Sequence, residues 1–112
     1  MNRLQEALES LCERAPGVTD AHLIARFVAS RDEAAFATLV RRHGPMVFGV
    51  CRRLLRHQQD AEDSFQAAFL VLARKARSVV KRESVGGWLY RVTYRIAMQA
   101  RIVSARRRAR EK

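Results

Sequence analysis

The chain is poor in the residues that break helices, start turns or cross-link segments. Its 112 residues include two prolines, five glycines and two cysteines, and no proline- or glycine-rich linker divides it, which favours one domain. No apolar run approaches the roughly 18 residues that a membrane-spanning helix needs. The N-terminus, where acidic residues lie among leucines, does not resemble a signal peptide. We therefore expect a single cytoplasmic domain with no membrane partner.

Motifs of catalysis and metal binding are also missing. Cys12 and Cys51 are isolated residues on apolar stripes, as expected of buried free thiols in a reducing compartment. The histidines, His22, His43 and His57, fall on different predicted elements with no carboxylate at ligand spacing. There is no Cys-x-x-Cys pair, His-x-x-x-His pair or glycine-rich phosphate loop. We expect no enzyme activity, no metal, no cofactor and no small-molecule substrate.

What the chain does contain is a series of helical patterns. It is 48% hydrophobic, which argues against disorder. The apolar residues recur at helical spacing, and the alternating pattern of strands is absent. The sequence predicts an all-α fold, a compact bundle of about four to five helices with a basic C-terminal helix extension. The expected helices cover residues 4–12, 20–28, 32–55, 60–76 and 88–103, the last one running on into the arginine-rich end.

Polar residues and helix breakers predict the boundaries. Thr19 or Asp20 can cap the second helix and Asp32 the third. Pro45, preceded by a glycine, predicts a kink or a short break in the third helix because proline lacks the backbone N–H. A turn is expected at residues 57–60 and a loop at residues 78–87.

All of the net charge of +11 lies in the last third of the chain. Residues 74–112 hold thirteen Lys or Arg and two acids, whereas residues 1–73 hold nine of each. A neutral body with a basic end is typical of a protein that binds a polyanion. Trp88, Tyr90 and Tyr94 lie among these arginines. Aromatic side chains stack on unpaired bases, so the mixture indicates nucleic acid rather than a membrane surface.

Three stretches of the sequence resemble a known family. They are RDEAAFATLVRRHGPMVFGVCRRLL, DAEDSFQAAFLVLARKA and SVGGWLYRVTYRIA. In this order and spacing they resemble the second conserved region of bacterial sigma factors, most closely the extracytoplasmic-function (ECF) branch of the sigma-70 family. The resemblance covers residues 20–108. It implies a helical domain that binds the RNA polymerase clamp and helps to open promoter DNA.

The resemblance also assigns candidate residues for two partners. The acidic cluster at the start of the fourth helix is explained either by the helix dipole alone or by a partner surface. By resemblance, Asp63 and Gln66 face the coiled coil of the largest subunit of core RNA polymerase, although Ala67 replaces a Glu that is frequent in the family. The candidate polymerase-binding residues are Asp60, Glu62, Asp63 and Gln66.

For DNA, the resemblance implies that the loop at 78–87 captures an unstacked base of the non-template strand of the minus-10 promoter element. Trp88 matches an aromatic near the melting point; the alternatives are a core anchor, a stacking group or a mixture of both. Tyr90 and Tyr94, on the same predicted helix, are core, surface or base-stacking residues. The candidate DNA-binding residues are Lys81, Arg82, Trp88, Tyr90, Arg91, Arg95, Arg101, Arg106 and Arg107.

Departures from the family pattern leave two functions open. Arg95 and Gln99 stand where the family usually has Asn and Asp, and the sequence ends without the helix-turn-helix domain of ECF factors. We expect a helix and linker at residues 1–18, a region 2-like domain at 19–105 and a basic tail at 106–112. The first function is promoter melting with core polymerase. The alternative is a truncated interaction module that docks on polymerase, or on an anti-sigma factor, without productive promoter opening.

Overall fold

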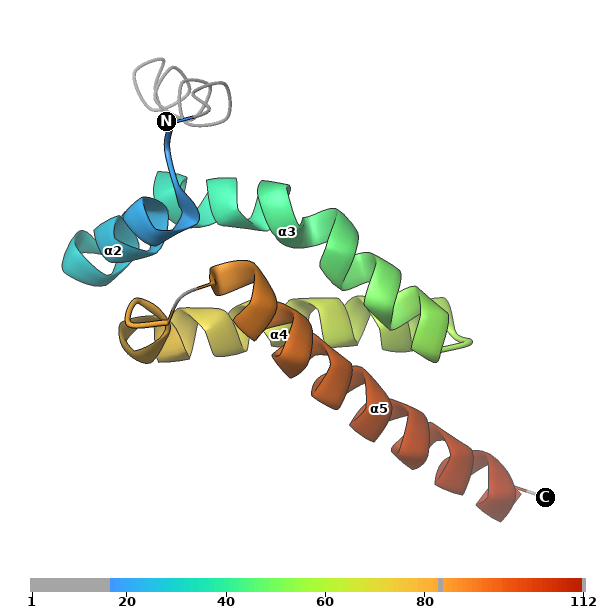
Figure 1. Cartoon of the computed structure of the whole chain (residues 1–112). Helices are drawn as coiled ribbons and strands as arrows, with labels where there is room; N and C mark the ends of the chain where they lie inside the picture. The colour runs from blue at the N-terminus through green and yellow to red at the C-terminus, as the bar shows by residue number, and fades with distance from the viewer. Residues whose placement is uncertain (1–16, 83, 112) are drawn as a thin grey trace.

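Four helices make up the part of the chain that the structure, a computed structural model, describes, namely residues 17–82 and 84–111 (Figure 1). They are α2 (Asp20–Ser30), α3 (Glu33–Leu54), α4 (Gln58–Val79) and α5 (Val85–Glu111), and no strand occurs among the described residues. The all-α prediction is confirmed. The helix expected at residues 4–12, with Cys12, lies outside the described residues.

A tight corner joins α2 to α3. The backbone N–H of His22 donates to Thr19 Oγ1 (3.0 Å), so the N-cap of α2 is Thr19 rather than Asp20. Arg31 ends α2 in a left-handed conformation with a φ of 53°. Asp32 then caps α3, accepting from the N–H of Ala35 at 3.2 Å. Both caps satisfy N–H groups that a helix start leaves without an intrahelical acceptor.

The helix α3 continues without a break through Pro45. Of the two expected outcomes, the short break is therefore absent, whereas α3 is visibly bent along its length in Figure 1. Leu39 and Val47, on either side of the proline, are both completely buried. Because both halves of α3 pack on the same core, their burial offsets the one backbone hydrogen bond that the proline removes.

Side chains from all four helices meet in one core. The largest completely buried ones include Leu23 and Ile24 of α2, Leu39 of α3, Leu72 of α4 and Leu89 of α5. In Figure 1, α3 lies above α4 and α5, and α5 crosses in front of α4 in the opposite chain direction and projects from the bundle at its C-terminal end. A row of phenylalanines joins α3 to α4, with ring centroids 5.9 Å apart for Phe48–Phe65 and 5.1 Å apart for Phe65–Phe69.

The connection between α4 and α5 is shorter than the loop expected at residues 78–87. The helix α4 extends to Val79, and α5 begins at Val85, three residues before Trp88. The N–H of Gly87 donates to Ser84 Oγ (2.9 Å), so Ser84 acts as a cap. Gly86 and Gly87, which end the range of the expected loop, lie inside α5, and a Cβ on Gly86 would come within 3.2 Å of the His43 ring. This glycine therefore serves close packing of α5 on α3. Likewise α4 begins at Gln58, inside the turn expected at 57–60.

Replacing the α3 cap should weaken the fold. Asp32→Ala should lower the free energy of unfolding at neutral pH by about 1 kcal/mol, the usual cost of losing a side-chain N-cap. Asp32 also pairs with Arg26 at 2.6 Å. Asp32→Asn is the matched control, because it keeps a capping oxygen and removes the charge and the second oxygen, which pairs with Arg26. Thermal unfolding of the three proteins measures both effects.

The same carboxylate should make stability depend on pH. Burial raises the pKa of Asp32, but the Ala35 N–H and the Arg26 guanidinium outweigh burial and hold the pKa below its ordinary value of 3.8. A lowered folded-state pKa stabilises the fold fully above the ordinary value, and this stabilisation is lost as pH falls through the folded-state pKa. Asp32→Asn should therefore lose less stability than the parent between about pH 5 and about pH 2. Equal losses in both proteins would contradict the assignment.

Candidate nucleic-acid interface

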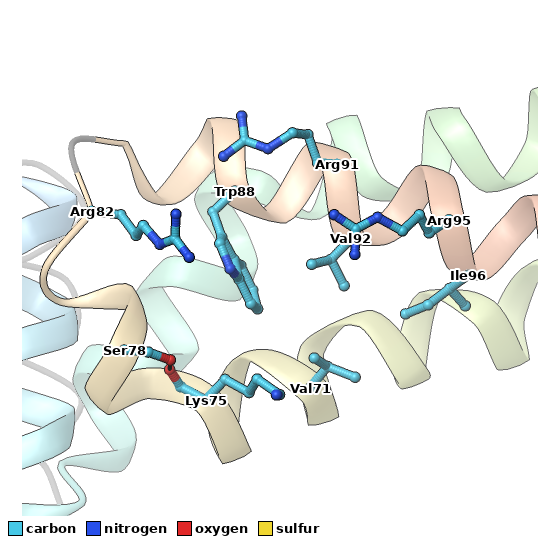
Figure 2. Close-up of a pocket in the computed structure, with 9 residues that line it drawn as sticks. All are labelled: Val71, Lys75, Ser78, Arg82, Trp88, Arg91, Val92, Arg95 and Ile96. Atoms are coloured by element: carbon cyan, nitrogen blue, oxygen red, sulfur yellow. Dashed lines mark hydrogen bonds between the residues drawn. The ribbon is translucent and has the colours of Figure 1, made fainter.

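A pocket of ≈ 450 Å³ lies between α4 and α5 (Figure 2). Among the described residues that line it, four side chains are cationic and none is acidic. Positive charges that line one pocket raise the local concentration of anions. The lining residues are Val71, Lys75 and Ser78 of α4, Arg82 of the connecting loop, and Trp88, Arg91, Val92, Arg95 and Ile96 of α5.

Trp88 forms the inner wall of this pocket. Its relative exposure is only 9%, and Figure 2 shows the indole pointing from α5 toward α4. Val92 and Ile96 extend the same wall along α5, and Val71 faces them from α4. Of the alternatives for Trp88, the core anchor therefore describes its position best. Little of its surface is therefore available to a ligand.

The cations come from both sides of the pocket. Lys75 lies on α4, and Arg82 extends from the loop toward the Trp88 indole in Figure 2. Arg91 is directed away from α4 at the rim. Lys81, which adjoins Arg82 in the sequence, does not line this pocket but lies on the α2 side of α4. Sequence reasoning grouped these two neighbours, and it missed Lys75, whose contribution becomes visible only once α5 is packed on α4.

Two tyrosines form a separate exposed surface on α5. Tyr90 and Tyr94 are 43% and 45% exposed, and their rings stack with centroids 6.5 Å apart at an interplanar angle of 22°. Each residue turns a helix by about 100°, so Tyr90 and Trp88 point to nearly opposite sides of α5, with Arg91 between them. The described residues thus present a cationic pocket and a stacking surface on one helix.

The end of α5 approaches the beginning of α4. Arg107 Nη2 lies 3.9 Å from Asp60 Oδ2, and Ser104 is buried at this end of the helix. The sequence assigned Asp60 to polymerase and Arg107 to DNA, but the structure brings the two together. Arg101 and Arg106 are exposed.

The outward face of α4 carries the other set of candidates. Asp63 and Gln66 are exposed one turn apart, whereas Asp60 and Glu62 are partly buried. Glutamines one turn earlier hold two of the carboxylates, since the Gln59 amide donates to Asp63 and the Gln58 amide to Glu62, each at 2.9 Å. The acidic face is therefore ordered by local hydrogen bonds.

Leu70 belongs to the same face and was missed from the sequence. It lies four residues after Gln66 and is 60% exposed, the most exposed of the large apolar side chains that the structure describes. The available signal was its position, because residues at i, i+3 and i+7 from Asp63 share one face of a helix. We call Asp63, Gln66 and Leu70 the clamp face, after the partner that the sequence resemblance predicts for Asp63 and Gln66.

A family model described as Sigma-70 region 2 matches residues 39–111. The chain belongs to this family. The match begins within α3 and reaches the end of α5, so it includes both the clamp face and the pocket. Region 2 domains generally bind core RNA polymerase and promoter DNA, and the family is not one of enzymes. No curated protein and no solved structure gives a significant match.

The α2 helix of this region 2 domain lies outside the matched residues but packs into the same core. His43 helps to hold it, since His43 Nε2 lies 2.7 Å from Asp20 Oδ2 and Arg42 contacts the other carboxylate oxygen at 3.2 Å. This histidine–carboxylate contact was not foreseen from the sequence spacing.

No group of three or more potential metal ligands occurs in the described residues. No helix among them is long and apolar enough to cross a membrane. Burial raises the pKa of the free Cys51 thiol.

Trp88→Ala should destabilise the domain because it leaves a cavity between α4 and α5. We expect a loss of roughly 3–5 kcal/mol in the free energy of unfolding. Tyr90→Ala, on the exposed side of the same helix, is the matched control and should cost less than about 1 kcal/mol. Chemical denaturation measures both. Similar losses for the two variants would contradict the buried position of Trp88.

Proposed function

We propose that this region 2 domain is the promoter-melting domain of an ECF-type sigma factor and acts in the bacterial cytoplasm. The observation that carries the proposal is the division of two surfaces between two helices. The clamp face lies on the outward side of α4, and the cationic pocket and the tyrosines lie along α5. One rigid domain can therefore contact polymerase and DNA simultaneously.

Melting needs no covalent chemistry. Unpairing and flipping a base costs a few kcal/mol, and phosphate contacts together with stacking, worth about 1–3 kcal/mol per base, can offset it. In this domain the cations of the pocket are suited to phosphates, and Tyr90 and Tyr94 offer faces on which bases of the minus-10 non-template strand can stack. Trp88 acts as the wall that sets the spacing between α4 and α5.

The polymerase contact is proposed for the clamp face, with Asp60 and Glu62 beside it. An acid, an amide and an exposed leucine along one helix face match a partner helix that offers basic, polar and apolar groups in turn. This is the chemistry expected of a coiled-coil partner such as the clamp of the largest subunit. Leu70 adds an exposed apolar group at the C-terminal end of the face, close to Ala67, which occupies the position where a Glu is frequent.

A double substitution tests the clamp face. Asp63→Arg with Gln66→Ala should abolish co-purification with core polymerase and leave the helix content unchanged in circular dichroism, because both side chains are exposed. Glu33→Arg, an equal charge change at an exposed residue of α3, should bind normally. Polymerase binding by a folded double variant would reject this face.

The arginines at the end of α5 should govern the salt dependence of DNA binding. In Arg106→Gln with Arg107→Gln, the slope of log affinity against log salt should fall by about 0.7 for each single-strand phosphate that is no longer neutralised. Arg52→Gln with Arg53→Gln removes the same charge from α3 and is the control. Anisotropy titrations with a single-stranded oligonucleotide give both slopes. An unchanged slope in the α5 variant would show that these arginines make no phosphate contact.

The alternative is an interaction module that docks on polymerase, or on an anti-sigma factor, without opening DNA. The burial of Trp88 favours it, because a side chain that is only 9% exposed offers little surface on which a base could stack. A promoter with 2-aminopurine in its minus-10 element separates the two functions, since its fluorescence rises when the base unstacks. A complex with core polymerase that binds this promoter without a fluorescence rise would favour the docking module.

A further inference from the structure

A second basic groove lies between α2 and α4, on the side of α4 turned away from α5. Two adjoining hollows of ≈ 330 and ≈ 510 Å³ form it, and Val28 and Arg77 line both. Ser78, at the end of α4, lines this α2–α4 groove and also the pocket beside α5. The groove is therefore a neighbour of the proposed DNA pocket but has its own walls.

The floor of the α2–α4 groove is apolar. Val28 contributes from α2 and Val80 from the residue that follows α4. Between them lie the small side chains of Ala73 and Ala76, which leave room for an apolar group of a partner. A hollow with such a floor gains stability when aliphatic side chains cover it.

The rim of the groove is cationic. Arg31, Arg74, Arg77 and Lys81 line it, and no acidic residue is among the described lining residues. Arg74 and Arg77 are exposed one turn apart on α4. Carboxylates spaced by one helical turn on a partner can therefore meet successive arginines.

Arg31 is fixed in place before any partner arrives. Its Nη1 donates to the carbonyl oxygen of Ala73 at 3.3 Å, and its guanidinium carbon lies 4.4 Å from the centroid of the Phe27 ring. Arg31 has a left-handed backbone conformation and lies at the corner between α2 and α3. A side chain that is already held in its binding position loses less conformational entropy when a partner binds.

We propose that the α2–α4 groove docks an acidic amphipathic segment of a partner protein. Such a segment supplies both kinds of group that the groove requires, carboxylates for the rim and aliphatic side chains for the floor. A nucleic-acid backbone supplies only the anions, and its phosphates would leave Val28, Val80 and the alanines uncovered. This inference does not depend on promoter melting, since it concerns a different surface.

A designed peptide tests the proposal. The probe is a fluorescent helical peptide of about 18 residues, long enough to hold helix structure, with leucines on one face and glutamates beside them. The protein should bind this peptide more tightly than it binds a scrambled peptide of the same composition. A single-stranded oligonucleotide at equal charge concentration should not displace the bound peptide. Equal affinity for the scrambled peptide, or displacement of the peptide by the oligonucleotide at equal charge concentration, would overturn the proposal.

Charge reversal locates the binding site. Arg74→Glu with Arg77→Glu should weaken peptide binding by about tenfold or more, because charge-assisted contacts become repulsive. Arg52→Glu with Arg53→Glu makes the same charge change on α3 and should weaken it much less. Equal weakening in the two variants would reject the groove. Val80→Asn should also weaken binding if the floor takes part, whereas unchanged affinity would reduce the site to a charge cluster and overturn the proposal.

A last variant addresses a competing occupant within the same chain. The sequence before Gly17 contains Leu4, Leu8 and Leu11 beside three glutamates. Replacing these three leucines by serine in the full chain should leave peptide affinity unchanged. A large gain in affinity would mean that the chain's own N-terminal residues occupy the groove, which would overturn the assignment to a partner protein.

Discussion

The packing of three helices around α4 is the constraint on which the rest of the domain depends. The inward side of α4 carries small residues, since Ala61, Ala68 and Ala76 are all buried, and Leu72 fills the centre of the core. Small side chains allow neighbouring helices to approach closely on several sides. The surfaces that remain are the clamp face, the pocket toward α5 and the groove toward α2. Each of them is bordered by α4, so a partner bound on one contacts the same rigid element as a partner bound on another.

The charges of α4 divide these surfaces along its length. Asp60, Glu62 and Asp63 lie in its first two turns, and Arg74, Lys75 and Arg77 lie near its end. Acidic residues at the start of a helix and basic residues at its end both interact favourably with the helix dipole. The same distribution of charge would direct a basic partner to the start of α4 and anionic partners to its end. The clamp face is at the acidic end, and both basic hollows are at the other. The charge distribution that stabilises α4 therefore also favours different partners at its two ends.

Local chemistry predicted much of this fold, and three-dimensional packing determined the remainder. The helical periodicity indicated the fold class, and Asp32 was identified as a cap because its side chain acts on residues only three positions away. The start of α5 was predicted wrongly at Trp88. Gly86, assigned to the loop, lies in the helix and packs against the His43 ring, a contact that local sequence does not reveal. The burial of Trp88 and the exposure of Leu70 depend on which helix covers which face, and helical spacing alone leaves both open.

Lys81 and Arg82 show that even neighbouring residues in one turn can lie on surfaces that the sequence does not distinguish. The N–H of Arg82 donates to the Val79 carbonyl oxygen at 2.9 Å, which closes a tight turn after α4. This turn directs the two neighbouring side chains to different hollows. Basic residues that are adjacent in the sequence therefore belong to different surfaces, whereas Lys75 and Arg95, twenty residues apart, share one pocket.

The contact between Arg107 and Asp60 raises the question of whether the proposed DNA and polymerase surfaces compete. The two atoms are 3.9 Å apart and Arg107 is more than half exposed. Exposed ion pairs of this kind contribute about 0–1 kcal/mol, whereas a single stacked base contributes about 1–3 kcal/mol. The pair is therefore too weak to hold Arg107 away from a phosphate or Asp60 away from a cation of a partner. The end of α5 is positioned by packing, as the burial of Ser104 indicates, and both partners can bind without separating α5 from α4.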